Sequence, residues 1–187
     1  MSLTELLVPT FKNMLRTLSG LLEKAEQQMP DRAEGLLAAR LTADMYPLSS
    51  QLRFAAYQAQ EASLRLRGES IPSSLVDVAT EGRHAGDVPG SLSQARARIG
   101  EALSFLDGLS GDALDAGAIL PITLELPRGI SFDMTGEDYA RDWVLAQFYF
   151  HVVTAYAILR QQGVEIGKAD YVPHMFAYLR PGTRPSA

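Results

Sequence analysis

The sequence contains no cysteine, and it has only three histidines and one tryptophan among its 187 residues. Without cysteine the chain forms no disulfide, offers no thiolate to a metal and has no cysteine nucleophile. Any metal site would therefore depend on the histidines together with aspartate and glutamate. The serines lie in no nucleophile-elbow pattern, and no glycine-rich phosphate-binding loop is present. Several common kinds of active site are thereby excluded.

Excess positive charge is also missing. The formal net charge is −5 at pH 7, whereas affinity for a nucleic-acid backbone depends on clustered lysine and arginine. We therefore expect no nucleic-acid partner. The amino terminus reads MSLTELLVPTFK, with Glu5 where a secretory signal would have a basic start and a continuous apolar run. We expect a cytoplasmic protein that does not associate with membranes.

The longest apolar stretch, residues 143–159, reads WVLAQFYFHVVTAYAIL. As a helix it would be about 25 Å long, short of the roughly 30 Å hydrocarbon core of a bilayer. Its polar side chains Gln147, His151 and Thr154 are spaced by four and three residues, so a helix places them on one face. The stretch is therefore expected to be a buried core helix with a single polar stripe.

The composition is that of a globular protein with one core. The chain is 47% hydrophobic and 21% charged, and its length is typical of a single domain. We expect one helical domain over residues 1–180. The remaining segment, residues 181–187, has the composition of a disordered tail.

Apolar residues recur at helical spacing in four long segments. Ser2 and Glu5 form a capping-box pattern that starts the first, with Pro9 expected to kink it. A short helical turn, AEGLLAARL, precedes the second, and Thr135 followed by Asp138 starts the last. The expected helices cover residues 2–28, 48–68, 91–107 and 135–162.

Two connections between these helices differ in kind. Residues 69–90 are rich in serine, proline, glycine and acids, and they are expected to form a long crossover. Residues 119–134 alternate between apolar and polar, as ILPITLEL and then ISFDM, which indicates a two-stranded hairpin. The sequence therefore predicts an all-α four-helix bundle with a long crossover and a small β-hairpin between the third and fourth helices.

Three strings in this order resemble the signatures of a known family: ARLTADMYPLSSQ, FYFHVVTAYAILRQQGV and IGKADY. The chain resembles, over nearly its whole length, an uncharacterised bacterial family, a domain of unknown function of the DinB/YfiT-like superfamily of metalloenzymes. The resemblance implies a DinB/YfiT-like bundle. It also raises the possibility of metal-dependent thiol S-transferase or hydrolase chemistry.

Metal-binding members of that superfamily typically use one histidine from the second helix and two histidines four residues apart on the last. His151 matches the first of the last pair, but position 155 is Ala155, and Gln51 stands nearest to the second-helix position. The resemblance thus implies a degenerate site in which His151 alone could ligate a divalent metal. We expect no bound cofactor.

The candidate site is the interior polar cluster of Asp44, Gln51, Gln147 and His151, which could orient a small-molecule ligand. Asp44 would serve equally as a helix N-cap, and either glutamine as a hydrogen-bond partner of His151. An Asp44 partner would raise the pKa of His151, whereas burial against Gln51 alone would lower it. No catalytic residue is assigned.

Outside this cluster, His84 is flanked by Glu81 and Asp87 in the expected crossover. These three residues could bind a metal, but a solvated polar loop is the simpler interpretation. Three functions remain open for the whole chain. They are a small-molecule-binding or non-catalytic bundle, a metal-dependent enzyme of DinB type, and a homodimeric interaction module. The homodimer is expected because residues 143–159 are apolar on more faces than one bundle can cover.

Overall fold

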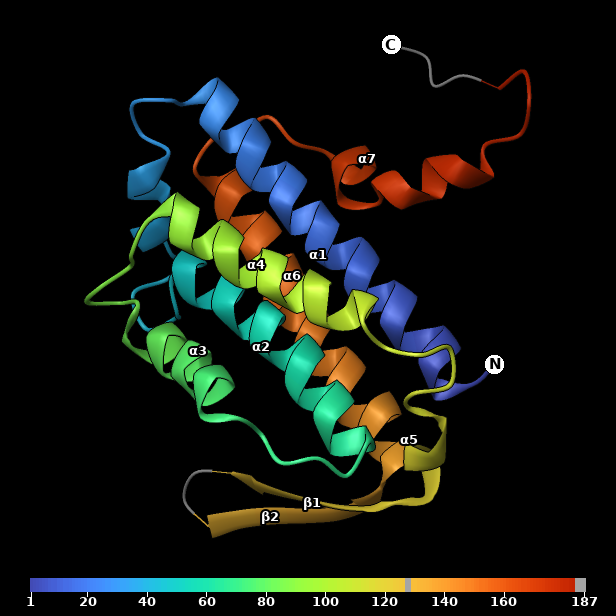
Figure 1. Cartoon of the computed structure of the whole chain (residues 1–187). Coiled ribbons are helices and arrows are strands. Elements are labelled where there is room, and N and C mark those ends of the chain that lie inside the picture. The colour runs from blue at the N-terminus through green and yellow to red at the C-terminus, as the bar shows by residue number, and fades with distance from the viewer. Residues whose placement is uncertain (127–128, 184–187) are drawn as a thin grey trace.

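Four long helices lie alongside one another in the computed structural model, which describes residues 1–126 and 129–183 (Figure 1). Helix α2 contacts α6 and α4, and α1 contacts both of these as well. The predicted four-helix bundle is therefore confirmed. The four helices are α1 (Leu3–Gln28), α2 (Leu48–Leu66), α4 (Leu92–Asp107) and α6 (Leu145–Gln161).

The start of α1 follows from its first residues. The Ser2 hydroxyl accepts the Glu5 N–H at 3.3 Å, and the Glu5 carboxylate accepts the Ser2 N–H at 2.9 Å. This capping box satisfies two donors that a helix start otherwise leaves without partners. The helix continues through Pro9 to Gln28, and a 3-10 helix (Glu34–Ala38) follows where the short helical turn was predicted.

The predicted crossover between α2 and α4 is wrong in one respect, because it contains a helix, α3 (Ser73–His84). Its buried residues Leu75, Val78, Ala79 and Gly82 are spaced by three and four and form one face of the helix, which packs against α2. A helix of three turns with such a short apolar face gives a weak periodic signal. As a consequence, His84 is the last residue of a helix and not part of a loop.

The hairpin is confirmed, and it lies across one end of the bundle (Figure 1). Strands β1 (Pro121–Leu126) and β2 (Ile130–Thr135) pair antiparallel, with Pro121 opposite Thr135. The Thr135 hydroxyl then accepts the Asp138 N–H at 3.2 Å and caps α5 (Gly136–Asp138). A wider π-type turn (Tyr139–Val144) leads into α6, so the predicted last helix is three consecutive helical segments.

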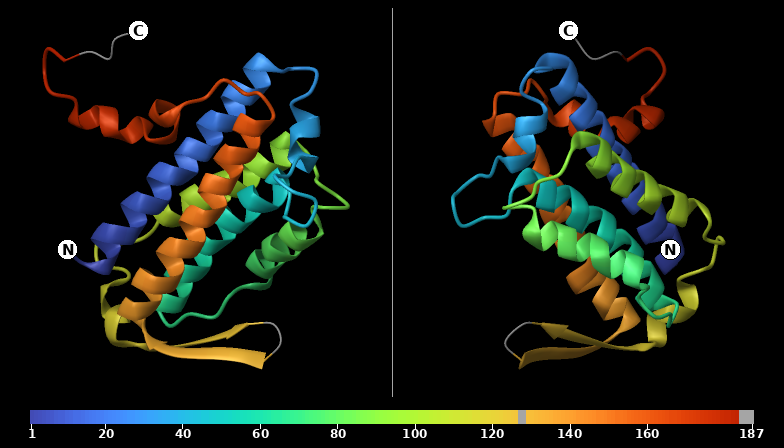
Figure 2. Two further views of the ribbon diagram at one scale, coloured as in Figure 1. Left: turned by 180° about the vertical axis from the view of Figure 1, so that it is seen from behind. Right: turned by 60° about the vertical axis from the view of Figure 1, so that its left-hand side comes forward.

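After α6 the chain turns back, and α7 (Lys168–Tyr171) contacts α1. A 3-10 helix (Pro173–Tyr178) follows and extends away from the bundle (Figure 2). Of the predicted disordered tail, residues 184–187 lie outside the described residues. Within the described part of the chain, no helix is long and apolar enough to cross a membrane.

Backbone contacts close the end of the bundle where the hairpin joins. A Cβ atom added at Gly117 would lie 2.0 Å from the Leu66 carbonyl oxygen, and one added at Gly136 would lie 1.9 Å from the Gly117 carbonyl oxygen. The Gly136 N–H also donates to the Leu120 carbonyl at 2.9 Å. The C-terminal end of α2, the 3-10 helix Asp115–Ile119 and α5 can therefore meet only if both positions are glycine.

We expect Gly117→Ala and Gly136→Ala each to lower the free energy of unfolding by about 1–3 kcal/mol or more, because a backbone oxygen has to move. Urea unfolding followed by circular dichroism measures the loss. Gly100→Ala in α4 is the matched control, since its added Cβ meets no atom within 4 Å. It should raise the stability by about 0.5–1 kcal/mol. Unchanged stability in both close-contact variants would contradict the geometry.

Candidate functional site

His151 lies on α6 and faces α2, partly buried between aromatic rings. Its ring centroid is 5.2 Å from that of Phe54 on α2 and 5.5 Å from that of Phe150. The Nδ1 atom lies 2.9 Å from Oε1 of Gln51, which is the predicted contact between the last helix and the second. This hydrogen bond joins residues a hundred positions apart in the sequence.

The orientation of Gln51 determines which nitrogen of His151 carries the proton. Gln51 Nε2 donates to the Tyr46 carbonyl at 3.1 Å, so Oε1 faces the imidazole and can only accept. Nδ1 of His151 is therefore the donor, and Nε2 keeps its lone pair. In the described part of the chain Nε2 has no hydrogen-bond partner, yet it is not sealed from solvent. Nε2 of His151 is thus a hydrogen-bond acceptor that solvent can reach.

Burial lowers the pKa of His151 to about 4, and no charged group contributes to the shift. This is the direction expected for burial against Gln51 without a carboxylate partner. The imidazole is therefore neutral near pH 7. A neutral ring with a defined tautomer can accept a hydrogen bond or bind a metal through Nε2, but it cannot act as a cation.

The other candidates of the interior cluster do not join His151. Asp44 is exposed in the turn before α2, whose N-cap is Pro47, so neither the N-cap interpretation nor a pairing with His151 is right. Gln147 is partly buried and makes no side-chain hydrogen bond within residues 1–126 and 129–183. Of the four predicted residues, the structure therefore brings together Gln51 and His151.

The residues around His151 do not fit the three-histidine metal site that the resemblance implies. Ala155, one turn further along α6, is buried and offers no ligand, and the Gln51 oxygen is engaged with Nδ1. Among the residues that the structure describes, no group of three or more His, Cys, Asp or Glu side chains converges. His84, Glu81 and Asp87 therefore do not form a metal-binding group either. His151 is therefore a single imidazole whose Nδ1 is hydrogen-bonded to a side-chain oxygen, without further metal ligands among the described residues.

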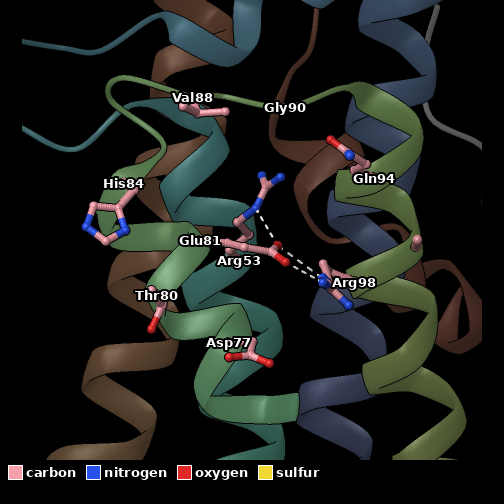
Figure 3. Close-up of a pocket in the computed structure, with 10 residues that line it drawn as sticks. Arg53, Asp77, Thr80, Glu81, His84, Val88, Gly90, Gln94 and Arg98 are labelled. Atoms are coloured by element: carbon pink, nitrogen blue, oxygen red, sulfur yellow. Dashed lines mark hydrogen bonds and ion pairs between the residues drawn. The ribbon is translucent and has the colours of Figure 1, made fainter. Parts of the chain in front are cut away.

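A large cavity lies elsewhere, in a cleft between α2, α3 and α4 (Figure 3). Its volume is about 630 Å³. The sequence does not reveal this cleft, because one of its walls is α3, which lies in the segment predicted as a crossover without a helix. The polar side chains that line it include Arg53 from α2, Asp77, Glu81 and His84 from α3, and Gln94 and Arg98 from α4.

An ion-pair network connects the three walls of this cleft. Glu81 accepts hydrogen bonds from Nε of Arg98 at 3.1 Å and from Nε of Arg53 at 3.2 Å. The hydrogen bonds from Arg98, and to a smaller extent those from Arg53, lower the pKa of Glu81 although burial opposes them. Glu81 is therefore ionised at neutral pH and holds α3 against both neighbouring helices.

We expect the His151 ring to titrate with a pKa of about 4 in ¹H–¹⁵N NMR spectra, with the proton on Nδ1 above that pH. The unfolded chain takes up this proton near pH 6.5 and the folded chain does not. The contribution of His151 to the free energy of unfolding is therefore fully present above pH 6.5. It falls as the pH drops toward 4, by up to about 3 kcal/mol. Solvent at the ring edge reduces this amount.

A matched pair of variants isolates the effect of His151 from that of the carboxylates. The difference in stability between neutral pH and about pH 5 should shrink in His151→Asn and stay unchanged in Gln147→Asn, which alters the same helix without removing a titratable group. A His151 ring that titrates near the ordinary histidine pKa would place it in water and contradict the buried hydrogen bond.

Comparison with known proteins agrees with this fold. The family model described as Domain of unknown function (DUF1993) matches residues 3–172. The crystal structure of a DinB family member protein from Shewanella denitrificans is similar, with a TM-score of 0.73 and 31% sequence identity. The match covers 98% of this chain and 96% of that one. No curated protein matches the chain. The chain therefore belongs to the DUF1993 family and has the DinB-like fold.

Proposed function

We propose that this protein is a small-molecule-binding member of its family with a degenerate metal site, in which His151 supplies a hydrogen-bond acceptor. The observation that carries the proposal is the fixed tautomer of His151. Because Gln51 holds Nδ1–H, the lone pair of Nε2 points away from that bond and is available to a ligand.

Aromatic side chains surround this acceptor. Tyr46 and Phe54 contact each other with ring centroids 5.2 Å apart, and Phe54 and Phe150 flank the imidazole. Tyr46 and Phe150 are about half exposed. A single polar acceptor among apolar walls suits an aromatic or aliphatic ligand that carries one hydrogen-bond donor. A metal-dependent transferase or hydrolase would need further ligands, which the described residues do not bring to His151.

We expect protein purified without an affinity tag to contain well under one zinc or nickel ion per chain, because one imidazole binds these ions weakly. Elemental analysis measures the metal content. In the same sample, phenol should shift the ¹⁵N resonance of His151 Nε2 saturably, and toluene, which has no donor, should not.

Two results would overturn this proposal. About one ion per chain that is lost in His151→Ala would assign a metal role to His151. An Nε2 resonance that responds equally to phenol and toluene would show that its lone pair accepts no ligand hydrogen bond.

A second candidate function, self-association, rests on the outer face of α6. Tyr149, Phe150 and Val153 are 37%, 54% and 47% exposed, and their spacing places them on one face of the helix. A row of exposed apolar side chains on a bundle helix is typical of a contact surface. Two copies related by two-fold symmetry would cover each other's row.

We expect sedimentation of the purified protein to show a homodimer at micromolar concentration. Val153→Glu should weaken the dimer at least about tenfold, because it places a charge in the apolar contact. Val76→Glu is the matched control, since Val76 is 45% exposed on α3, away from α6. A monomer at micromolar concentration, or equal effects of the two substitutions, would argue against this surface.

A further inference from the structure

The floor of the cleft between α2, α3 and α4 is a nearly fully buried arginine. The Arg53 side chain is 4% exposed, and its Nη1 donates to the Ser49 carbonyl at 3.3 Å and to the Ser49 hydroxyl. Nε donates to Glu81. Nη2 has no partner within residues 1–126 and 129–183, although it is not sealed off from the cleft. A buried guanidinium with an unused N–H edge is suited to bind a carboxylate.

The surroundings of this edge add further donors. The Gln94 side-chain oxygen accepts the Ser91 N–H at 2.9 Å, which leaves its amide nitrogen able to donate. The start of α4 lies here as well and contributes positive potential. A Cβ atom at Gly90 would lie 2.7 Å from Nη2 of Arg53 and 2.5 Å from Oε1 of Gln94. Glycine, with a φ of +72°, therefore keeps this end of the cleft open.

The opposite end of the cleft carries an acceptor. Asp77 lies one helical turn before Glu81 on the same face of α3, about 6 Å along the axis. It is exposed and forms no ion pair in the described part of the chain. Between the two ends, Arg98 and Glu81 engage each other. Figure 3 shows the Arg53 guanidinium directed toward Gly90 and Gln94, with Asp77 at the other end.

The charges of the lining decide which ligand fits. Arg53 and Arg98 balance Asp77 and Glu81, so the cleft is neutral as a whole but has a donor end and an acceptor end. A simple anion would meet two carboxylates, and a simple amine would meet two guanidinium groups. A molecule with one negative and one positive group meets a complementary partner at each end.

We infer that this cleft binds a small amino carboxylate whose ammonium and carboxylate groups are separated by several bonds. The carboxylate binds Nη2 of Arg53 and the amide of Gln94, and the ammonium group binds Asp77. Asp77 lies one helical turn from Glu81, which Arg53 contacts, so we infer that the ligand's two charged groups are separated by more than the neighbouring carbons of an α-amino acid. This inference concerns a different surface from His151 and does not depend on the function proposed there.

The test is a titration with ε-aminocaproate followed in ¹H–¹⁵N NMR spectra. The Gly90 amide and the Arg53 Nε–H resonances should shift saturably. Caproate lacks the ammonium group and hexylamine lacks the carboxylate, and each should bind at least about fivefold more weakly. Absence of saturable shifts at millimolar ε-aminocaproate, or equal binding of caproate, would overturn the inference.

Two nearly isosteric variants test the two ends without disturbing the fold. Gln94→Glu keeps the capping box of α4, because glutamate also accepts the Ser91 N–H, but it places a carboxylate beside Arg53. Asp77→Asn removes the charge of an exposed side chain. Each should weaken ε-aminocaproate binding, the first at least about tenfold and the second at least about threefold. Wild-type affinity in either variant would refute the assigned contacts.

Discussion

Helix α2 is enclosed by α3, α4 and α6, and two of its buried polar side chains, Gln51 and Arg53, form their hydrogen bonds inside the protein. Leaving a buried polar group without a partner costs about 1–3 kcal/mol. Gln51 meets this requirement through Tyr46 and His151, and Arg53 meets it through Ser49 and Glu81. In the first candidate site Gln51 orients His151, whose Nε2 is the unused hydrogen-bonding atom. In the second, the unused atom within the described residues is Nη2 of Arg53 itself.

The pair of Gln51 and His151 has the arrangement that usually supports a metal ligand. In metalloproteins a ligating histidine commonly donates its second ring N–H to an oxygen that fixes the ring and its tautomer. Gln51 makes the same kind of hydrogen bond to His151, and Ala155 stands at the position where the resemblance to metal-binding bundles implies another ligand. In the function that we propose, this supported imidazole acts without further metal ligands. A small-molecule-binding function would require only the imidazole of His151 and its hydrogen bond to Gln51.

Periodicity predicted the fold because most of the chain follows simple patterns. The capping box at Ser2 and the change from helical to alternating spacing near Ile119 are local signals, and the structure contains both features. Local signals cannot show what lies beside a helix. Asp44 resembled an N-cap, but Pro47 starts the helix, and the burial of Arg53 depends on α3 and α4. Burial of a charged residue is a tertiary property that its own segment does not reveal.

The presence of α3 within the crossover also bears on how the protein folds. Because α3 packs on α2, and α4 packs on α2 as well, residues 48–107 form a continuous stretch whose later helices both pack on its first helix. Contacts of this kind close short loops, which cost little chain entropy and form rapidly. Helices α1 and α6 come from the two ends of the chain, and the hydrogen bond from His151 to Gln51 spans a hundred residues. The central helices can thus assemble early, and the terminal ones complete the enclosure of α2 afterward.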